Sequence, residues 1–195
     1  LFMEPVAKYA QDPVKKDIFD RFLNHQNMGG LMITEPDFGS DALNMQTSNV
    51  KKGSNYHIRG TKHWQGLTGM ADYWLMTSRR LHDNGNLGRD IDFFIVDEHQ
   101  ANQTIKVEEY YNNAGLYPIP YGKNKIDIMV PEEFKFKEES SGIKIIMELF
   151  YRSRLQFSGM GMGFIRRNLD EAIEHVSNRN VGGRPLLALD QVKHQ

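Results

Sequence analysis

Apolar residues near the start of the chain recur at every fourth position. Val14, Ile18 and Phe22 form one stripe, and this spacing predicts an amphipathic helix. We expect Asp12 to cap the N-terminus of this helix, because the Pro13 that follows suits the first helical position. A Gly-Gly pair soon after the stripe predicts the end of the helix.

Between residues 31 and 131 the pattern changes to short runs that are apolar or alternate between apolar and polar positions. These runs are rich in β-branched and aromatic residues, and Gly- and Asn-containing turns separate them. We predict strands at 56–59, 73–77, 91–96, 105–108 and 126–128. Short strands without helices between them predict an antiparallel β-barrel or sandwich.

Beyond residue 131 the apolar period is helical again, and residues 142 to about 179 are predicted to form one long helix. On its polar face, Arg166 and Arg167 lie four positions before Asp170 and Glu171, which predicts two ion pairs. The whole pattern predicts an α+β fold in which an antiparallel β-barrel or sandwich domain is flanked by helical segments.

Composition and charge narrow the functional classes. The 195 residues carry 24 Lys and Arg against 25 Asp and Glu, so the net charge of −1 argues against binding nucleic acid through phosphate attraction. No apolar run approaches the length of a membrane span. The sequence has no Cys, which excludes disulfides and fits the cytoplasm. Because the sequence opens on Leu1 without a signal-like stretch, we expect a fragment of a longer protein.

The first candidate for chemistry is the Thr-Glu-Pro-Asp-Phe-Gly-Ser-Asp sequence at 34–41. Its Pro fixes a turn, Gly39 permits close approach to the backbone, and Ser40 offers a hydroxyl. Consecutive N–H groups in such a loop form an anion site suited to a phosphate. The local pattern by itself favours the other interpretation, an ordinary turn that joins two strands.

A second candidate is the Gly-Thr-Lys-His-Trp-Gln-Gly sequence at 60–66. Trp64 offers a broad flat face on which an aromatic cofactor can lie. The alternative is a half-buried Trp on a strand, and composition alone favours that alternative at least as much.

Together the two motifs, at this spacing, resemble the middle domain of acyl-CoA dehydrogenases. Arg154, the Gly-rich run at 159–163, and the stretch from Arg179 through Gly-Arg-Pro-Leu to Gln191 resemble the C-terminal domain of that family. The resemblance implies three parts. They are the end of an N-terminal helical domain at 1–29, a middle β-barrel domain at 30–134, and the start of a C-terminal helical domain at 135–195.

The resemblance implies a flavoprotein oxidoreductase of fatty acid metabolism that binds FAD. Thr34 would hydrogen-bond the edge of the flavin ring, Ser40 would contact the pyrophosphate, and Trp64 would lie beside the ring. Arg179 and Gln191 would reach the FAD of a neighbouring subunit. The implied flavin-binding residues are Met32, Ile33, Thr34, Gly39, Ser40, Trp64, Gln65, Gly66, Arg179 and Gln191.

The family reaction removes a proton α to the thioester carbonyl and transfers the β-hydrogen with its electron pair to the flavin, which requires a carboxylate base. The resemblance places this base beyond residue 195 or, in a minority of members, at the position of Ser153, which is not a base. We therefore expect no catalytic residue here and an inactive isolated chain. We interpret Glu148 as a solvated helix carboxylate. The implied acyl-CoA contacts are Ser40, Tyr151, Arg152, Ser153 and Arg154.

Three departures from the family pattern keep other functions open. Trp-Gln-Gly at 64–66 replaces Trp-Ile-Thr, the segment 113–118 differs from the usual Gly-Leu-Arg-Gly-Ser, and Val181-Gly182 follows the Arg179 region in place of the usual aromatic residue. Acyl-CoA oxidases, which share the scaffold, commonly have Gly at position 66. The alternatives are an acyl-CoA oxidase or flavin monooxygenase, and a non-catalytic module that has lost the flavin.

The resemblance also implies partners. These are an acyl-CoA substrate, an electron-transfer flavoprotein or similar acceptor, and further copies of the chain in a dimer or tetramer. We expect the helix at 142–179 to present an apolar face to such neighbours. The histidines at 57, 63, 82, 99 and 175 show no metal-ligand spacing, so no metal site is predicted.

Overall fold

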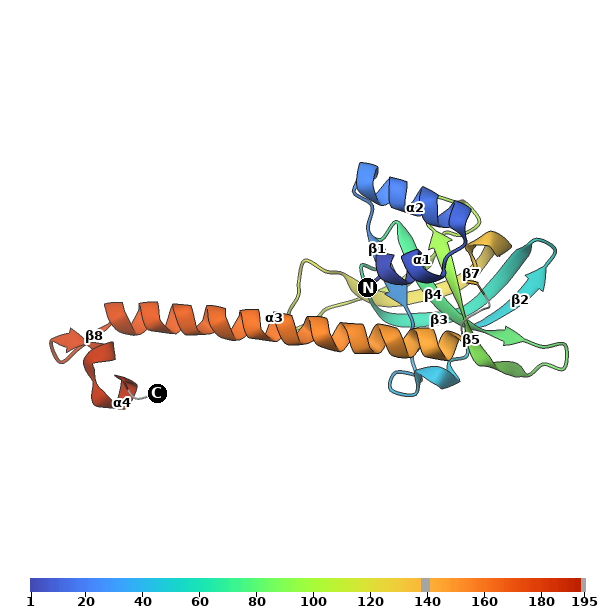
Figure 1. Cartoon of the computed structure of the whole chain (residues 1–195). Helices are drawn as coiled ribbons and strands as arrows, with labels where there is room; N and C mark the ends of the chain where they lie inside the picture. Colours follow the sequence, from blue (N-terminus) through green and yellow to red (C-terminus); the bar gives the residue numbers. More distant parts are fainter. Residues whose placement is uncertain (138–140, 194–195) are drawn as a thin grey trace. The chain divides into compact units, whose positions relative to one another are not determined.

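The computed structural model describes residues 1–137 and 141–193. These residues form two compact units, Leu1–Leu149 and Phe150–Gln195, and each unit is described by itself (Figure 1). The first unit holds the N-terminal helices, a seven-stranded sheet and the first turns of a long helix. The second unit holds the rest of that helix and a short C-terminal hairpin with one helical turn.

Two helices open the first unit: α1 at Met3–Tyr9 and α2 at Asp12–His25. The predicted stripe is confirmed, since Val14 and Ile18 are buried. The prediction that Asp12 caps α2 is wrong. Gln11 is the N-cap, and Asp12 is the first helical residue, where its carboxylate interacts favourably with the positive end of the helix dipole.

The strands of the first unit confirm the predicted β-region and extend it. Each predicted strand lies within or overlaps an observed one, but two short strands were not foreseen, at the start of the sheet and just after the 34–41 loop. The strands are β1 Gly29–Met32, β2 Ser48–Lys52, β3 Asn55–Gly66, β4 Tyr73–Leu81, β5 Leu87–Asp97, β6 Lys106–Tyr111 and β7 Tyr121–Pro131.

The sheet is curled and mixed, not purely antiparallel (Figure 1). Its order is β1-β4-β2-β3-β7-β6, and β5 pairs with β4. The predicted α+β fold, a β-domain flanked by helical segments, is confirmed. Most of its strand pairs are antiparallel, as expected, but β1 and β2 both pair with β4 in parallel. The physical reason is that the 33–47 loop carries the chain from β1 to β2 without reversing its direction along β4.

Apolar side chains on one face of the sheet form a buried cluster, and the N-terminal helices pack through aromatic rings on Tyr73, which alternation along β4 places on the opposite face. Phe22 contacts Phe2 and Tyr73, with ring centroids 5.3 and 5.7 Å apart. The buried cluster consists of Met32, Tyr56, Ile58, Ala71, Trp74, Met76, Phe94, Val96, Ile105, Ile126, Ile128 and Val130. Burial of this apolar surface is the main source of stability for the unit.

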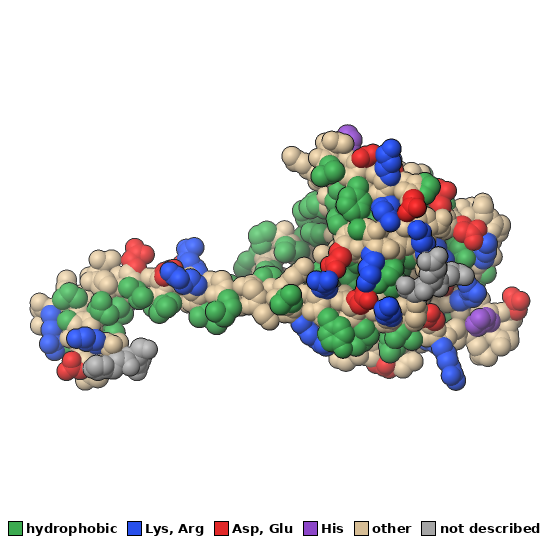
Figure 2. All heavy atoms as spheres, viewed as in Figure 1, with side chains coloured by type: hydrophobic (Ala, Val, Ile, Leu, Met, Phe, Trp, Pro, Cys, Tyr) green, Lys and Arg blue, Asp and Glu red, His purple; other side chains and the backbone are tan. Residues whose placement is uncertain are grey.

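The long helix α3 runs from Gly142 to Asn178, as the sequence predicted. Gly142 lies so close to Ile91 that a Cβ would fall 1.6 Å from the carbonyl oxygen of that residue. Ile145, Ile146 and Leu149 are buried in the first unit. Within the second unit, apolar side chains along α3 are exposed (Figure 2), and the predicted Arg166–Asp170 and Arg167–Glu171 ion pairs are confirmed.

The remainder of the second unit is a short β-hairpin, whose two strands have two residues each, followed by a short helix. Strands β8 Asn180–Val181 and β9 Arg184–Pro185 pair across Gly182 and Gly183, whose φ angles of 61° and 81° lie in the left-handed region. Glycine adopts this region without a steric penalty, which explains the Gly-Gly pair. Helix α4 then spans Asp190–Lys193.

Candidate functional site

The loop after β1 makes a tight turn at Glu35–Phe38. The N–H of Glu35 donates to the carbonyl of Phe38 at 3.3 Å, and the N–H of Phe38 donates back at 3.2 Å. Pro36 therefore lies at the first central position of the turn, where its fixed φ is favourable. The turn leaves Gly39 and Ser40 exposed at the surface of the unit.

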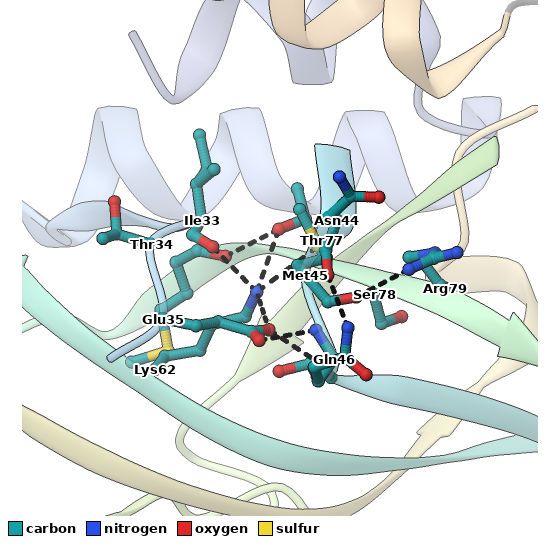
Figure 3. Close-up of polar contacts among 12 residues, drawn as sticks. Ile33, Thr34, Glu35, Asn44, Met45, Gln46, Lys62, Thr77, Ser78 and Arg79 are labelled. Atoms are coloured by element: carbon teal, nitrogen blue, oxygen red, sulfur yellow. Dashed lines mark hydrogen bonds and ion pairs between the residues drawn. The ribbon is translucent and has the colours of Figure 1, made fainter. Parts of the chain in front are cut away.

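A buried ion pair anchors this loop to the sheet (Figure 3). The Nζ atom of Lys62 lies 3.1 Å from Glu35 Oε1, 2.9 Å from the carbonyl oxygen of Ile33 and 3.2 Å from Thr77 Oγ1. Lys62 is fully buried, and desolvation lowers its pKa to about 8 although Glu35 opposes the shift. The loop 33–47 is thereby fixed to β3 and β4.

The carboxylate of Glu35 is satisfied from three sides. Besides Lys62, it accepts the N–H groups of Gln46 at 2.6 Å and Thr47 at 2.9 Å. Burial disfavours the charged form of Glu35, but Lys62 and the N–H donors outweigh it and hold the pKa of this carboxyl below its ordinary value. This pair was not predicted from the sequence, although Glu35 and Lys62 each belong to one of the two motifs.

The two motifs meet at the carbonyl oxygen of Thr34. This oxygen accepts the N–H of His63 at 2.9 Å and the Nε2–H of Gln65 at 3.1 Å. The structure thus brings together the loop that ends at Ser40 and the strand that bears Trp64, as the sequence analysis expected.

Trp64 lies on β3, at a position where the strand pairing is irregular. The pairing of β3 with β7 shifts between His63 and Gln65, so Trp64 is the extra residue of a β-bulge. Its φ of 60° is left-handed, and its side chain is 53% exposed. The bulge takes Trp64 out of the strand alternation and displays its ring beside the Thr34 crossing point.

The residues near this crossing point fit a flat, polar ligand. Gln65 is buried, and within residues 1–137 and 141–193 no group donates a hydrogen bond to its Oε1 atom. A Cβ at Gly39 would meet only Thr34 Cγ2, at 4.0 Å, so packing within the chain does not require this glycine. A Cβ at Gly66 would meet Tyr121 and Ile119 at 3.4 and 3.5 Å, which is contact with little strain.

Two of the predicted flavin-binding residues belong to the core. The side chain of Met32 is fully buried, and its carbonyl accepts a hydrogen bond from Thr77. Ile33 is 8% exposed, and its carbonyl accepts the hydrogen bond from Lys62. Both residues thus stabilise the strand that carries Thr34 to the surface.

The other predicted contacts lie in the second unit and are placed by their local structure. Tyr151 and Arg154 are exposed one helical turn apart, with the guanidinium 5.7 Å from the ring centroid. Arg152 is also exposed on α3, and the Ser153 hydroxyl donates to the carbonyl of Phe150 at 2.9 Å. Arg179 directly precedes the β8–β9 hairpin, where its carbonyl accepts the N–H of Leu186, and Gln191 is exposed on α4.

Glu148 has a structural role, and its description as a solvated carboxylate is incomplete. Its Oε2 atom accepts hydrogen bonds from Lys8 Nζ and from the Tyr9 hydroxyl, both at 2.6 Å. The bond from Lys8, followed by the bond from Tyr9, holds the pKa of Glu148 below its ordinary value. The carboxylate therefore ties α1 to the first turns of α3 within the first unit.

Two broader features complete the description of the chain. No helix within residues 1–137 and 141–193 combines the length and apolar character needed to cross a bilayer. Over the same residues, no cluster of three or more His, Asp and Glu side chains is arranged to hold a metal ion.

Comparison with known proteins adds two family matches. The model of the acyl-CoA dehydrogenase middle domain matches residues 30–127, and that of the acyl-CoA dehydrogenase C-terminal domain matches residues 140–195. The chain is 26% identical over 193 residues to an L-prolyl-[peptidyl-carrier protein] dehydrogenase from Pseudomonas fluorescens, covering 98% of this chain and 50% of that protein. It is 25% identical over 195 residues to mouse mitochondrial short-chain specific acyl-CoA dehydrogenase, covering 99% and 46%.

Solved structures show the same fold. A probable acyl-CoA dehydrogenase from Mycobacterium abscessus superposes with a TM-score of 0.88 at 24% identity, covering 100% of this chain and 50% of that one. Butyryl-CoA dehydrogenase from Megasphaera elsdenii gives a TM-score of 0.88 at 22% identity, covering 98% and 50%. The chain spans about half the length of the curated relatives that it matches.

Proposed function

Because this chain belongs to the acyl-CoA dehydrogenase family, we propose that it carries the flavin side of an FAD-dependent oxidoreductase that forms the α,β double bond of an acyl-CoA thioester. The observation that carries the proposal is the meeting of both motifs at the Thr34 carbonyl, beside the exposed ring of Trp64. In this proposal residues 30–134 are the middle β-domain, between helical parts at 1–29 and 135–195.

The bound FAD supplies the redox chemistry, and the residues of this chain bind and orient it. Trp64 provides the flat surface beside the ring. The hydroxyl of Thr34 and the backbone at Gly66 face the ring edge, while the buried Gln65 amide fixes the Thr34 backbone. Because Glu35 and Lys62 hold the loop rigidly, the donors at Gly39 and Ser40 are preorganised before the ligand arrives.

The pyrophosphate of the proposed FAD is negatively charged, so the site that binds it needs a positively charged group. Asp37 and Asp41 flank the exposed Ser40, and like charge disfavours a phosphate there unless a positive group compensates. We assign this role to Arg179 of a neighbouring subunit, with Gln191 also reaching the cofactor. The proposed assembly is therefore a homo-oligomer, either a dimer or a tetramer.

The substrate side is assigned to Ser40 and to residues 151–154. We propose that the catalytic carboxylate lies outside these 195 residues. Ser153 donates its hydroxyl to a helix carbonyl, and Glu148 is held by Lys8 and Tyr9, so neither acts as the base. The isolated chain is expected to bind FAD without oxidising acyl-CoA.

Titration of the purified 195-residue chain with FAD, followed by flavin fluorescence, tests the proposal. Saturable binding that Trp64→Ala or Ser40→Ala weakens supports it. A chain that retains no FAD at any concentration, with its fold intact by circular dichroism, would favour the module that has lost its flavin.

The electron acceptor separates a dehydrogenase from an oxidase. We propose an electron-transfer flavoprotein or a similar protein as acceptor. Gly66 is the observation that favours an oxidase as second candidate, because it offers the flavin no hydroxyl. In the full-length parent, rapid dioxygen consumption with acyl-CoA would overturn the dehydrogenase assignment.

The exposed apolar residues of α3 give a test of assembly. Large apolar side chains along this helix, including Leu155, Phe157, Met160 and Phe164, are more than 60% exposed. Exposed apolar surface of this extent drives association. We expect the isolated chain to self-associate in sedimentation velocity, and a clean monomer would contradict the expectation.

A further inference from the structure

Three rings gather beside the β-bulge of β3. The centroids of Trp64 and Tyr111 lie 4.5 Å apart with their planes tilted by 43°. The His63 ring meets Trp64 edge-on at 5.5 Å, and it meets Tyr111 edge-on at 6.1 Å. This ring cluster, defined as His63, Trp64 and Tyr111, brings together residues from two strands that are not neighbours in the sheet.

The strand register explains how Tyr111 reaches Trp64. Tyr111 pairs with Tyr121 on β7, and Tyr121 pairs with Gly66 on β3. Tyr111 is thus separated from β3 by one strand, and its ring extends over β7 toward the bulge. Since Trp64 is the extra residue of the bulge, no cross-strand partner on β7 fixes its side chain.

A polar contact closes the cluster. The hydroxyl of Tyr111 lies 3.3 Å from Nδ1 of His63. Burial, followed by Glu109, raises the pKa of Tyr111, so its hydroxyl keeps its proton at neutral pH. Burial, and then the nearby Lys123, lower the pKa of His63, while Asp37 opposes them.

We propose that Tyr111 is a positioning residue, which with His63 fixes the plane of the Trp64 indole against which the flat ring of the cofactor lies. The inference rests on the proposed flavin site, but the orientation of Trp64 can be measured without any ligand. Neither His63 nor Tyr111 was among the residues that sequence analysis assigned to the site.

The two tryptophans of the chain make the measurement selective. Trp74 is 1% exposed and donates its Nε1–H to Glu98 at 3.0 Å, whereas Trp64 is 53% exposed. Acrylamide therefore quenches mainly Trp64, and a Trp64→Phe variant supplies the Trp74 background. Fluorescence anisotropy of the quenchable fraction reports how freely the Trp64 ring moves.

The experiment compares Tyr111→Ala, Tyr111→Phe and Tyr110→Ala in the complete 195-residue chain. Tyr110 is the matched control, because it neighbours Tyr111 on β6, is 60% exposed and faces the opposite side of the sheet. We expect Tyr111→Ala to increase quenching, lower the anisotropy of Trp64, and raise the Kd for FAD about two- to tenfold. Tyr111→Phe keeps the ring and should retain most of both properties.

Two results would overturn the proposal. One is unchanged quenching and anisotropy of Trp64 in Tyr111→Ala. The other is a freed Trp64 whose variant binds FAD as tightly as the unmodified chain. If the unmodified chain binds no FAD, the proposed function fails instead, and the ligand-free fluorescence still decides whether Tyr111 orients Trp64.

Discussion

Lys62 and Trp64 are two residues apart on β3, yet they belong to opposite kinds of environment. Lys62 is fully buried and bonded to Glu35, Ile33 and Thr77, while Trp64 is 53% exposed on a bulge. The first belongs to a rigid internal support, and the second belongs to a surface that can receive a ligand. Changes at the support should therefore affect folding, and changes at the displayed surface should affect binding.

The largest expected effect comes from breaking the support. Lys62→Met leaves the Glu35 carboxylate buried without its cation, which should lower the free energy of unfolding by about 3–5 kcal/mol. Urea denaturation measures this loss. The double variant Lys62→Met/Glu35→Gln should recover part of the stability, and Lys52→Met, on the exposed end of β2, serves as control. A loss at Lys62 no larger than at Lys52 would contradict the assignment of the pair as a support.

The displayed surface should respond in the opposite way. Ser40→Ala removes one hydroxyl from an exposed position, so thermal stability should not change. FAD binding should weaken by about 1.5–3 kcal/mol, the usual contribution of a hydrogen bond to a charged group. Titration by flavin fluorescence measures the difference, and an unchanged Kd would remove Ser40 from the site.

Two glycines sharpen the same contrast. A Cβ at Gly60 would lie 2.2 Å from Thr47 Oγ1 and 2.8 Å from Thr47 Cα, whereas a Cβ at Gly39 meets open space apart from one contact at 4.0 Å. Gly60→Ala should destabilise the fold by about 1–3 kcal/mol in thermal unfolding. Gly39→Ala should leave the thermal stability unchanged and weaken the binding of FAD. Equal melting temperatures for the two variants would contradict the expectation, because they would mean that Thr47 and the 33–47 loop can shift to accommodate the new methyl group at little cost.

The smallest effect is expected at Asp127 on β7, which pairs with Arg59 of β3 on an exposed part of the sheet. Hydrogen bonds from Arg59, and then from His57, lower the pKa of Asp127 to about 2. Because the folded pKa is depressed, the stabilisation is complete above the ordinary value of 3.8 and is lost as pH falls through about 2. The melting temperature of Asp127→Asn should lie slightly below that of the unmodified chain at neutral pH and converge with it in acid. A constant difference down to pH 2 would exclude Asp127 as its source.

Much of the secondary structure could be predicted from local pattern. The long helix beginning at Gly142 and the strands of the β-region follow from apolar periodicity, which depends on burial of one face. The short strands β1 and β2, and their parallel pairing with β4, could not be predicted in this way. Four or five residues carry too little periodicity, and strand direction depends on the path of the 33–47 loop.

In the candidate site, too, some features could be predicted from the sequence and others depended on the tertiary structure. The sequence by itself identified Thr34, Ser40 and Trp64 as parts of one family signature. This was possible because the residue types of a motif and their spacing can be read directly from the chain. Only the tertiary structure decided that Glu35 and Lys62 form a buried pair, that Trp64 lies at a bulge of β3, and that Tyr111 contacts its ring. These features depend on which strands become neighbours and at what register, and that is fixed by packing of the whole sheet.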